Sequence, residues 1–524
     1  MCIRDRLYTI RSVRTFHRIR TFPTFLGFFQ KPEQFAFAIG HQQTPMRHHS
    51  ILLFVIIGLA VEAQSFEEAL WFGERDLIGS PRYTALGGAM GALGNDFSSV
   101  HDNPAGLAVF RRGRLELDLG VGSREFTSAY YGEDVRERSA SLFIAQAGLV
   151  GELEELGSKD VRYFAGLSFK RLADFGRRFK VAGSNPVSSI IDQWIYNSNG
   201  IPSDQLIDQG WLYEGMAWEA YLTDVIDPAN FTYSSSATGL DLMQERAVRQ
   251  SGGHDELLFS LAANRRHRLF YGAGIGIPFL EMTEESNYTE SEFDANSPVN
   301  DLLLYDRYGL SAVGINLHLG FQYRFNYWWR VGASWISPTV YAMNSNFETQ
   351  LSANFRDGTS ARSQEYYNDE ILYRLTTPQR FMCSSAFVIG KSGFISVEYR
   401  SAQMNWQRFH SRDFDLENID KQATDQLGWQ HTLTLASEFR AGPVYLRGFH
   451  LWGNSPYSKD ARGLEAQRAF GFGTGFTFSK WRCDIAWRRQ LSDRPYSLYS
   501  SEFTEPATLS DRNSMLVMGV FLSF

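Results

Sequence analysis

Apolar and polar side chains alternate in long runs from residue 114 to the end of the chain. Successive side chains of a β-strand point to opposite faces, so strict alternation predicts strands whose two faces have different surroundings. The clearest run, 309–325, has an apolar set of Val313, Ile315, Leu317, Leu319, Phe321, Tyr323 and Phe325. The pattern predicts fourteen strands: 114–122, 139–149, 161–170, 255–264, 268–280, 308–325, 329–343, 373–389, 393–402, 428–440, 443–453, 467–478, 481–490 and 513–524.

The connections between these segments alternate in length. Short turns and long polar loops follow one another, and the longest loop runs over 171–254. An even strand number with short turns at one end and loops at the other is typical of outer-membrane barrels. The fold class expected is therefore all-β, a fourteen-stranded antiparallel transmembrane β-barrel over 114–524. Aromatic residues near strand ends are expected in its interfacial girdles: Trp328, Trp329, Trp335, Trp481, Trp487 and Tyr445. A β-sandwich is the alternative, since it also alternates.

The amino-terminal region is interpreted as two segments that precede the mature protein. Residues 46–63 combine a basic start, an apolar core and a small-residue end, the pattern of a signal peptide cleaved after Ala63. Met46 would be the true start, with 1–45 translated upstream sequence. Removing the eight basic and three acidic residues of 1–63 from totals of 51 and 58 leaves a net charge of −12. That charge argues against a nucleic-acid partner.

Composition and motifs favour a protein that is not an enzyme. Neither Gly-X-Ser-X-Gly nor His-Glu-X-X-His occurs, and the histidines lack the spacing of metal ligands. Cys383 and Cys483 lie far apart in strand-like runs, so no disulfide framework or metal site is indicated. We expect no catalytic residues, no metal and no cofactor, although residues of a catalytic site could still converge from separate strands. His318 and Arg324 are expected to line the lumen.

The segment 64–113 precedes the first strand and contains GGAMGALGNDFSSVHDNPAGL over 87–107. Its glycines fit neither a dinucleotide fingerprint, which follows a buried strand, nor a P-loop, which needs Lys-Ser or Lys-Thr. The segment is too apolar for a disordered tail, so it is expected to pack in the lumen as a partly helical hatch. Glycines on inward strand positions are its expected docking lines: Gly272, Gly274, Gly276, Gly471, Gly473 and Gly475. Easing of barrel curvature is the alternative role for those glycines.

Taken in order, the signal peptide, the Gly-rich hatch and the fourteen strands ending in Phe524 resemble the FadL/TodX family of outer-membrane transporters, in a Bacteroidetes-like version. The resemblance covers essentially the whole mature chain. Separately, the terminal aromatic Phe524 on its alternating strand resembles the recognition signal of the barrel-assembly machinery. The family resemblance implies a hatch motif of Gly87, Gly88, Gly91, Gly94, Asp96, Asn103, Pro104, Ala105 and Gly106.

The resemblance implies a monomer in the bacterial outer membrane, with its carboxyl terminus in the periplasm and membrane lipids around it. Hydrophobic small molecules, long-chain fatty acids or aromatic hydrocarbons, would enter passively through an apolar lumen pocket and leave sideways into the bilayer. Gly166 is the expected kink at the lateral gate. Candidate ligand-binding residues, taken as inward-facing, are Leu142, Ile144, Phe164, Phe270, Val517 and Phe521, and packing against the hatch is the alternative for each.

Two other functions remain open at this stage. Related barrels of type IX secretion bind secreted protein cargo, and the acidic loop 171–254 could serve as a protein-binding lid. Its acidic residues are Asp192, Asp204, Asp208, Glu214, Glu219, Asp224 and Asp227. The third hypothesis is a purely structural surface barrel.

Overall fold

The computed structural model describes residue 73 and residues 75–523, except 413–415, 458–466 and 479–480. The fold reported below belongs to the unit Ile57–Phe524. The expected upstream segment 1–45, the signal peptide 46–63 and the terminal Phe524 lie outside the described residues.

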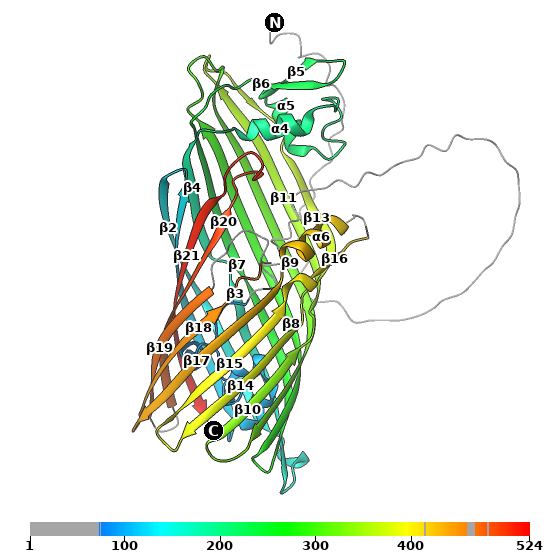
Figure 1. The fold of residues 1–524 in the computed structure, drawn as a ribbon. Coiled ribbons are helices and arrows are strands. Elements are labelled where there is room, and N and C mark those ends of the chain that lie inside the picture. Colours follow the sequence, from blue (N-terminus) through cyan, green and yellow to red (C-terminus); the bar gives the residue numbers. More distant parts are fainter. Residues whose placement is uncertain (1–72, 74, 413–415, 458–466, 479–480, 524) are drawn as a thin grey trace, which may run out of the picture. The chain divides into compact units, whose positions relative to one another are not determined.

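The strands form one closed antiparallel barrel (Figure 1). Strand β1 (Arg114–Tyr130) is hydrogen-bonded to β2 (Glu133–Glu152) along one edge and to β21 (Ala507–Ser523) along the other, so the sheet has no free ends. Fourteen staves make the wall, and four of them are interrupted. In wall order, those between β2 and β21 are β3 with β4 (Val161–Asp174, Arg177–Asn185), β7 (Leu242–Arg265), β8 (Leu269–Ser291), β9 (Val299–Arg324), β10 with β11 (Trp329–Ile336, Val340–Phe355), β14 with β13 (Arg380–Ile389, Tyr366–Thr376), β15 with β16 (Gly393–Gln403, Arg408–His410), β17 (Trp429–Ala441), β18 (Val444–Gly453), β19 (Gln467–Phe478) and β20 (Trp481–Tyr496). This confirms the predicted fold class.

The two ends of the barrel differ as the connection lengths predicted. Tight turns close one end; the β7–β8 turn uses Arg266 and His267, both with positive φ, and the β17–β18 turn uses Gly442. At the other end the strands run further than expected, and β9 alone has 26 residues. Some of these extensions are polar on both faces and others bury one face in a separate apolar cluster, so the strand prediction missed them. The predicted loop between the first two strands is likewise a strand hairpin that turns at Tyr131 and Gly132.

The segment 171–254 is structured instead of being one long loop. It contains β4, the first half of β7, helices α4 (Ile190–Ser198) and α5 (Leu212–Glu219), and a small hairpin of β5 (Thr223–Asp227) with β6 (Thr232–Ser235). The helices and hairpin lie at the end of the barrel opposite the tight turns (Figure 1). A large apolar cluster joins them to the extended strands, with Trp194 of α4 and Tyr288 of β8 fully buried. Outside this segment, the short strand β12 (Ser360–Arg362) pairs with the end of β11, and helix α6 (Glu417–Gln426) lies beside β16 (Figure 1).

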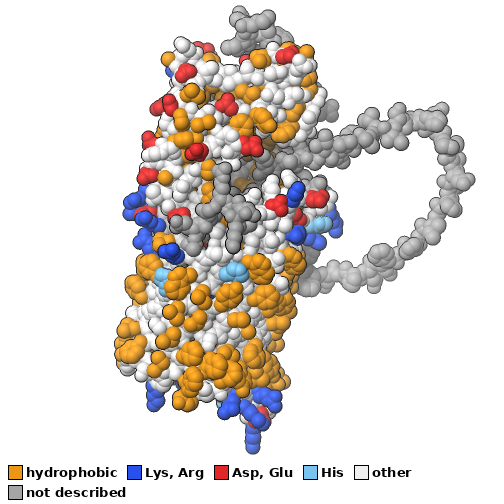
Figure 2. Space-filling view, viewed as in Figure 1, with side chains coloured by type: hydrophobic (Ala, Val, Ile, Leu, Met, Phe, Trp, Pro, Cys, Tyr) orange, Lys and Arg blue, Asp and Glu red, His pale blue; other side chains and the backbone are white. Residues whose placement is uncertain are grey.

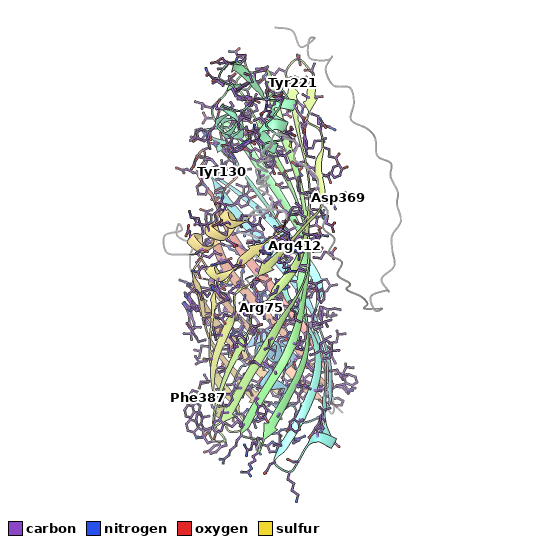
Figure 3. All side chains as sticks on the ribbon, turned by 90° about the vertical axis from the view of Figure 1, so that its right-hand side faces the viewer. Arg75, Tyr130, Tyr221, Asp369, Phe387 and Arg412 are labelled. Carbon is purple, nitrogen blue, oxygen red and sulfur yellow. The ribbon has the colours of Figure 1, made fainter. Side chains whose placement is uncertain are left out.

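An apolar band covers the outer surface of the barrel on the side of the tight turns (Figure 2). Outward-facing strand residues such as Leu115 and Leu117 are about half exposed, which a bilayer would cover. Near the turns, Trp328, Trp329 and Phe387 stack on one another, and Figure 3 shows Phe387 near this end. The prediction for Tyr445 is wrong, because its ring points inward and lies beneath the guanidinium groups of Arg447 on the same strand and of Arg482 in β20. No helix in the described part of the chain is long and apolar enough to cross a bilayer.

The amino-terminal segment occupies the lumen. It comprises helices α2 (Pro81–Ala85) and α3 (Phe97–Asp102) and the 3₁₀ helix η2 (Pro104–Val109), and nearly all of its residues are buried. Strand glycines leave room for it: a Cβ on Gly272 would lie 2.6 Å from the carbonyl carbon of Pro104. On the far side of the barrel, a Cβ on Gly473 would lie 2.6 Å from Cβ of Ala85. The segment therefore spans the lumen from β8 to β19.

Candidate functional site: the lumen segment and the wall cavity

Two side-chain caps hold the lumen segment in its fold. The Ser80 hydroxyl accepts from the backbone N–H of Tyr83 at the start of α2, and Asp96 accepts from the N–H of Ser99 at the start of α3. Ser80 also donates to Oδ2 of Asp96 at 2.5 Å. Short polar residues at these positions satisfy N–H groups that a helix start leaves without partners. The two short helices are thereby tied to each other.

Asn103 links the segment to the barrel wall. Its side-chain amide donates to the carbonyl of Gly91 at 2.8 Å and to that of Phe321 in β9 at 3.1 Å, and its oxygen accepts from the N–H of Ala105. Pro104 then begins η2, where a missing N–H costs nothing. The Asn-Pro-Ala element thus joins α3, η2 and β9.

The glycines of the hatch motif lie in the turns between these elements. Gly87, Gly88 and Gly94 have positive φ, a conformation that side chains disfavour. Gly94 and Gly106 pack against each other, because a Cβ on Gly106 would lie 3.1 Å from the α-carbon of Gly94. Gly91 presents its carbonyl to Asn103 and its N–H to Glu398 of β15. The structure therefore brings the motif residues into one compact unit.

A charged cluster connects the last residue of α3 to two strands. Asp102 accepts from Arg400 of β15 at 2.9 Å and from the hydroxyl of Tyr83 at 2.6 Å, and Lys170 of β3 lies 3.9 Å away. Burial alone would raise the pKa of Asp102, but the charges of Arg400 and Lys170 bring it down to about 2. Asp102 is therefore ionised in this lumen at any physiological pH.

His101 forms a second polar link from α3 to the wall. Its Nδ1 lies 2.8 Å from Glu256 of β7 and its Nε2 lies 3.0 Å from the Ser168 hydroxyl of β3. Burial lowers the pKa of His101 to about 4, although Glu256 opposes this. His318 faces the lumen, as expected, and lies 2.8 Å from the carbonyl of His101. The sequence did not single out Lys170, Glu256 or Arg400 as partners, because each is an isolated charge on a strand.

A cavity of about 130 Å³ lies beside this cluster. Figure 3 labels Arg75, one of its lining residues, partway along the barrel. Its lining mixes charged and apolar side chains, which include Arg75, Asp102, Lys170, Arg380, Arg400, Leu77, Leu172 and Met382. This cavity is more polar than the apolar lumen pocket expected from the resemblance.

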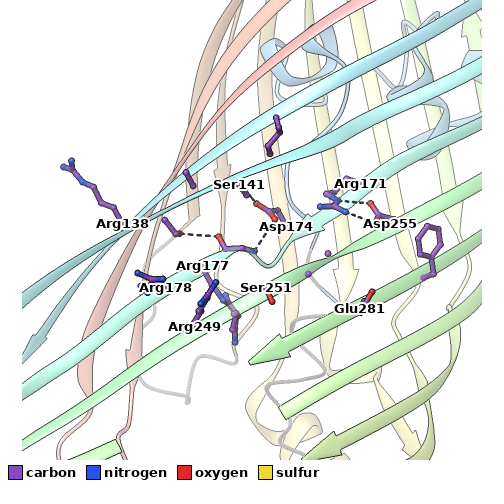
Figure 4. Close-up of a pocket in the computed structure, with 18 residues that line it drawn as sticks. Arg138, Ser141, Arg171, Asp174, Arg177, Arg178, Arg249, Ser251, Asp255 and Glu281 are labelled. Carbon is purple, nitrogen blue, oxygen red and sulfur yellow. Dashed lines mark hydrogen bonds and ion pairs between the residues drawn. The ribbon is translucent and has the colours of Figure 1, made fainter. Parts of the chain in front are cut away.

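The barrel wall is interrupted on one side. Strands β2 and β3 are paired only over 146–152 and 164–170, and beyond this point the described part of β4 is paired with β7 alone. Side chains bridge the gap, since the Ser141 hydroxyl donates to Oδ2 of Asp174 at 2.5 Å. A cavity of about 680 Å³ opens here, lined by β2, the β3–β4 junction, β7 and β8 (Figure 4).

The predicted gate residue lies close to this interruption. Gly166 is inside β3, paired with Val150 and Ser260, and a Cβ on it would lie 2.7 Å from a methyl group of Leu107 in the hatch. The ladder to β2 ends four residues later, at Lys170, and the register with β7 shifts between Arg171 and Ala173. The irregularity of this stave therefore falls after Gly166.

Two candidate ligand residues face the opposite way from the prediction. Leu142 is 76% exposed and Ile144 is 47% exposed on the outer surface of β2. The reason is a β-bulge: Asp118 pairs with Gln146 and Leu119 pairs with Ile144, which leaves Ala145 without a partner. One extra residue reverses which side chains of β2 point inward. Phe143 is consequently buried against the lumen segment with Ile78.

The other candidates pack around the lumen segment. Phe164 and Phe270 belong to a buried cluster with Phe97 and Leu107 of the hatch. Val517 is buried in the cluster that contains Ile78. Phe521 is partly buried, and the guanidinium of Arg114 lies 4.1 Å from its ring centre. The positions of Phe164, Phe270 and Val517 agree with the alternative considered for them, which was packing against the hatch, whereas the ring contact of Phe521 is with β1.

The closed wall, the apolar band and the occupied lumen define a transmembrane β-barrel that holds its own amino-terminal segment. Among solved structures it is similar to the Pseudomonas putida toluene transporter TodX, with 14% identity and a TM-score of 0.52 over 86% of this chain and 99% of that chain. It is also similar to a Pseudomonas aeruginosa FadL homologue, with 9% identity and a TM-score of 0.54 over 86% and 100%. The expected resemblance to the FadL/TodX type is thus confirmed at the level of the fold. No family model and no curated protein matches the sequence.

Proposed function

We propose that this protein is an outer-membrane channel for passive uptake of hydrophobic small molecules. Support comes from the fold shared with TodX and the FadL homologue, from the apolar band and from the lumen segment. An apolar solute gains free energy on moving from water into hydrocarbon, so such a channel needs no energy source. In the outer membrane, the tight turns and the carboxyl terminus would face the periplasm, and α4 and α5 would face the outside of the cell.

The lateral route to the bilayer would pass through the wall gap. The single observation that carries this proposal is the loss of pairing between β2 and β3 beyond Gln146 and Lys170. A continuous ladder is the usual barrier to sideways movement, because each broken backbone pair costs free energy in lipid. Here the barrier consists of side-chain contacts such as Ser141 with Asp174, which a solute could displace.

A disulfide across the gap tests the route. A Cβ on Gly176 would lie 3.2 Å from Cβ of Ser141, close to the separation in disulfides. In a background without the exposed Cys383 and Cys483, the S141C/G176C variant should lose most uptake when oxidised and regain it when reduced. The control is S123C/S514C, which joins strands that are already paired. Full uptake by the oxidised S141C/G176C barrel would contradict lateral release.

A second function, binding of secreted protein cargo, is favoured by one observation at the external end. Apolar side chains of the 171–254 region are about two-thirds exposed there, including Tyr196, Ile226 and Leu240. Co-purification distinguishes the two functions, since a shuttle would retain secreted protein and a channel would retain an apolar ligand. A structural surface barrel would retain neither.

A further inference from the structure

Two arginines lie directly opposite each other at the wall gap. Arg178 of β4 and Arg249 of β7 are register partners, and both side chains are exposed. Within the described part of the chain, neither has a hydrogen bond or ion pair to another side chain. Like charges at directly opposite positions of an antiparallel pair are destabilising. An anion bound between them would remove this repulsion.

The surroundings of this pair carry a surplus of positive charge. Five arginines line the cavity, against the carboxylates of Asp174, Asp255 and Glu281. The Asp255 carboxylate accepts from Nε and Nη2 of Arg171, at 2.8 and 2.9 Å, and Asp174 accepts from the Ser141 hydroxyl. The remaining arginines are Arg138, which is paired with Glu125, and Arg177, which bonds to Gln250. On its other side Arg249 faces Glu285 of β8 in register, but no ion pair joins the two within the described residues. Arg178 and Arg249 are therefore the arginines of this lining whose guanidinium groups can meet an external anion.

The opposite part of the same cavity is apolar. Leu142 and Phe279 line it, and Phe279 packs against Phe169 with ring centres 6.4 Å apart. These residues continue the apolar band of the outer surface. Figure 2 shows basic side chains gathered along the upper edge of that band, on the side where Figure 1 places β2 and β4. The cavity is thus cationic above and apolar below, at the depth where the head groups of the outer leaflet would lie.

We propose that this cavity binds a membrane lipid of the outer leaflet through a phosphate in its head group. Arg178 and Arg249 would each donate to the phosphate oxygens, a geometry that suits the planar guanidinium, and the Ser251 hydroxyl lies in the same lining. A hydrocarbon chain would lie along Leu142 and Phe279. The bound lipid would cover the interrupted part of the wall. The inference rests on the proposed membrane location but not on transport.

Native mass spectrometry of the delipidated, folded protein tests the site. Phosphatidic acid should bind at least tenfold more tightly than phosphatidylcholine with the same chains. R178Q/R249Q should lose about tenfold or more of that affinity, because two charged contacts are removed. The control is R265Q/R268Q, which removes the same charge from the tight-turn end of β7 and β8 and should bind as the unmodified protein does.

Thermal unfolding gives a second readout that does not depend on lipid capture. Without lipid, R178Q/R249Q should melt at the same or a higher temperature than the unmodified protein, since the repulsion is gone. Phosphatidic acid should raise the melting temperature of the unmodified protein only. Equal affinity of both proteins for phosphatidic acid would overturn the proposal. Displacement of the lipid by millimolar inorganic phosphate would also overturn it, in favour of a site for small free anions. Neither outcome bears on lateral release, which the uptake experiment with S141C/G176C tests separately.

Discussion

Nη2 of Arg400 lies 2.9 Å from Oδ2 of Asp102, so β15 is joined to the last residue of the lumen helix α3. Arg400 also donates to the carbonyl of Gly88 and pairs with Glu398, which in turn accepts from the N–H of Gly91. One arginine of the wall therefore holds the lumen segment at two points, Gly88 and Asp102. Movement of the lumen segment requires that this set of bonds be broken together.

Loss of the Asp102 charge should loosen the lumen segment without unfolding the barrel. In D102N, Arg400 and Lys170 keep their charges but lose the carboxylate between them, at a cost of about 1.5–3 kcal/mol. Amide hydrogen exchange over 75–110 should quicken by roughly ten- to a hundredfold, while exchange in the strands stays unchanged. D134N, at the exposed β1–β2 hairpin, is the control. Unchanged exchange in D102N would show that the pair does not anchor the segment.

Substitution of Asn103 and Pro104 by alanine should alter uptake in a barrel that still assembles. The change removes the side-chain bonds to the carbonyls of Gly91 and Phe321, and with them the link to β9. Uptake of an apolar probe is compared with the heat-modifiable gel mobility that reports a folded barrel. Unaltered uptake by a well-folded variant would refute a gating role for the hatch motif.

A methyl group at a docking glycine should disturb the hatch, whereas the same change elsewhere on the wall should not. In G272A the new Cβ would lie 2.6 Å from backbone atoms of Pro104, which cannot move independently of η2. We expect a lower melting temperature and faster exchange in 75–110. Gly151 of β2 is the matched control, because a Cβ there meets no atom within 4 Å. Equal behaviour of G272A and G151A would rule out close packing at this position.

Acid should weaken docking of the lumen segment through His101. Its pKa is about 4 when docked and about 6.5 when free, so the free segment binds the extra proton first. The docked state is then fully stable above about pH 6.5 and loses stability as the pH falls toward 4. Exchange at 97–102, corrected for intrinsic rates, measures this slope. It should disappear in H101Q, whereas a persistent slope would assign the effect to another group. Asp102 contributes only below about pH 4, since its docked pKa is about 2.

Hydrophobic periodicity was sufficient to predict the barrel. Each of the fourteen alternating segments became a stave, because a period of two records which face of a strand meets the apolar band. Inward glycines were informative for the same reason: Gly272 and Gly473 lie where the chain approaches another backbone or side chain closely. Periodicity carried no signal for the external extensions, where both faces of the strands are polar or meet a separate core.

Only the tertiary structure decided the details of the sites. A single unpaired residue, Ala145, reversed the inward set of β2 and placed Leu142 on the outer surface, and no local pattern marks such a bulge. The pairs Asp102 with Arg400 and Arg178 with Arg249 join positions 298 and 71 residues apart in the chain. Their proximity follows from strand register and barrel closure, which depend on all fourteen staves at once. Alternation along one strand specifies its faces, but only the closed sheet specifies which charges meet across them.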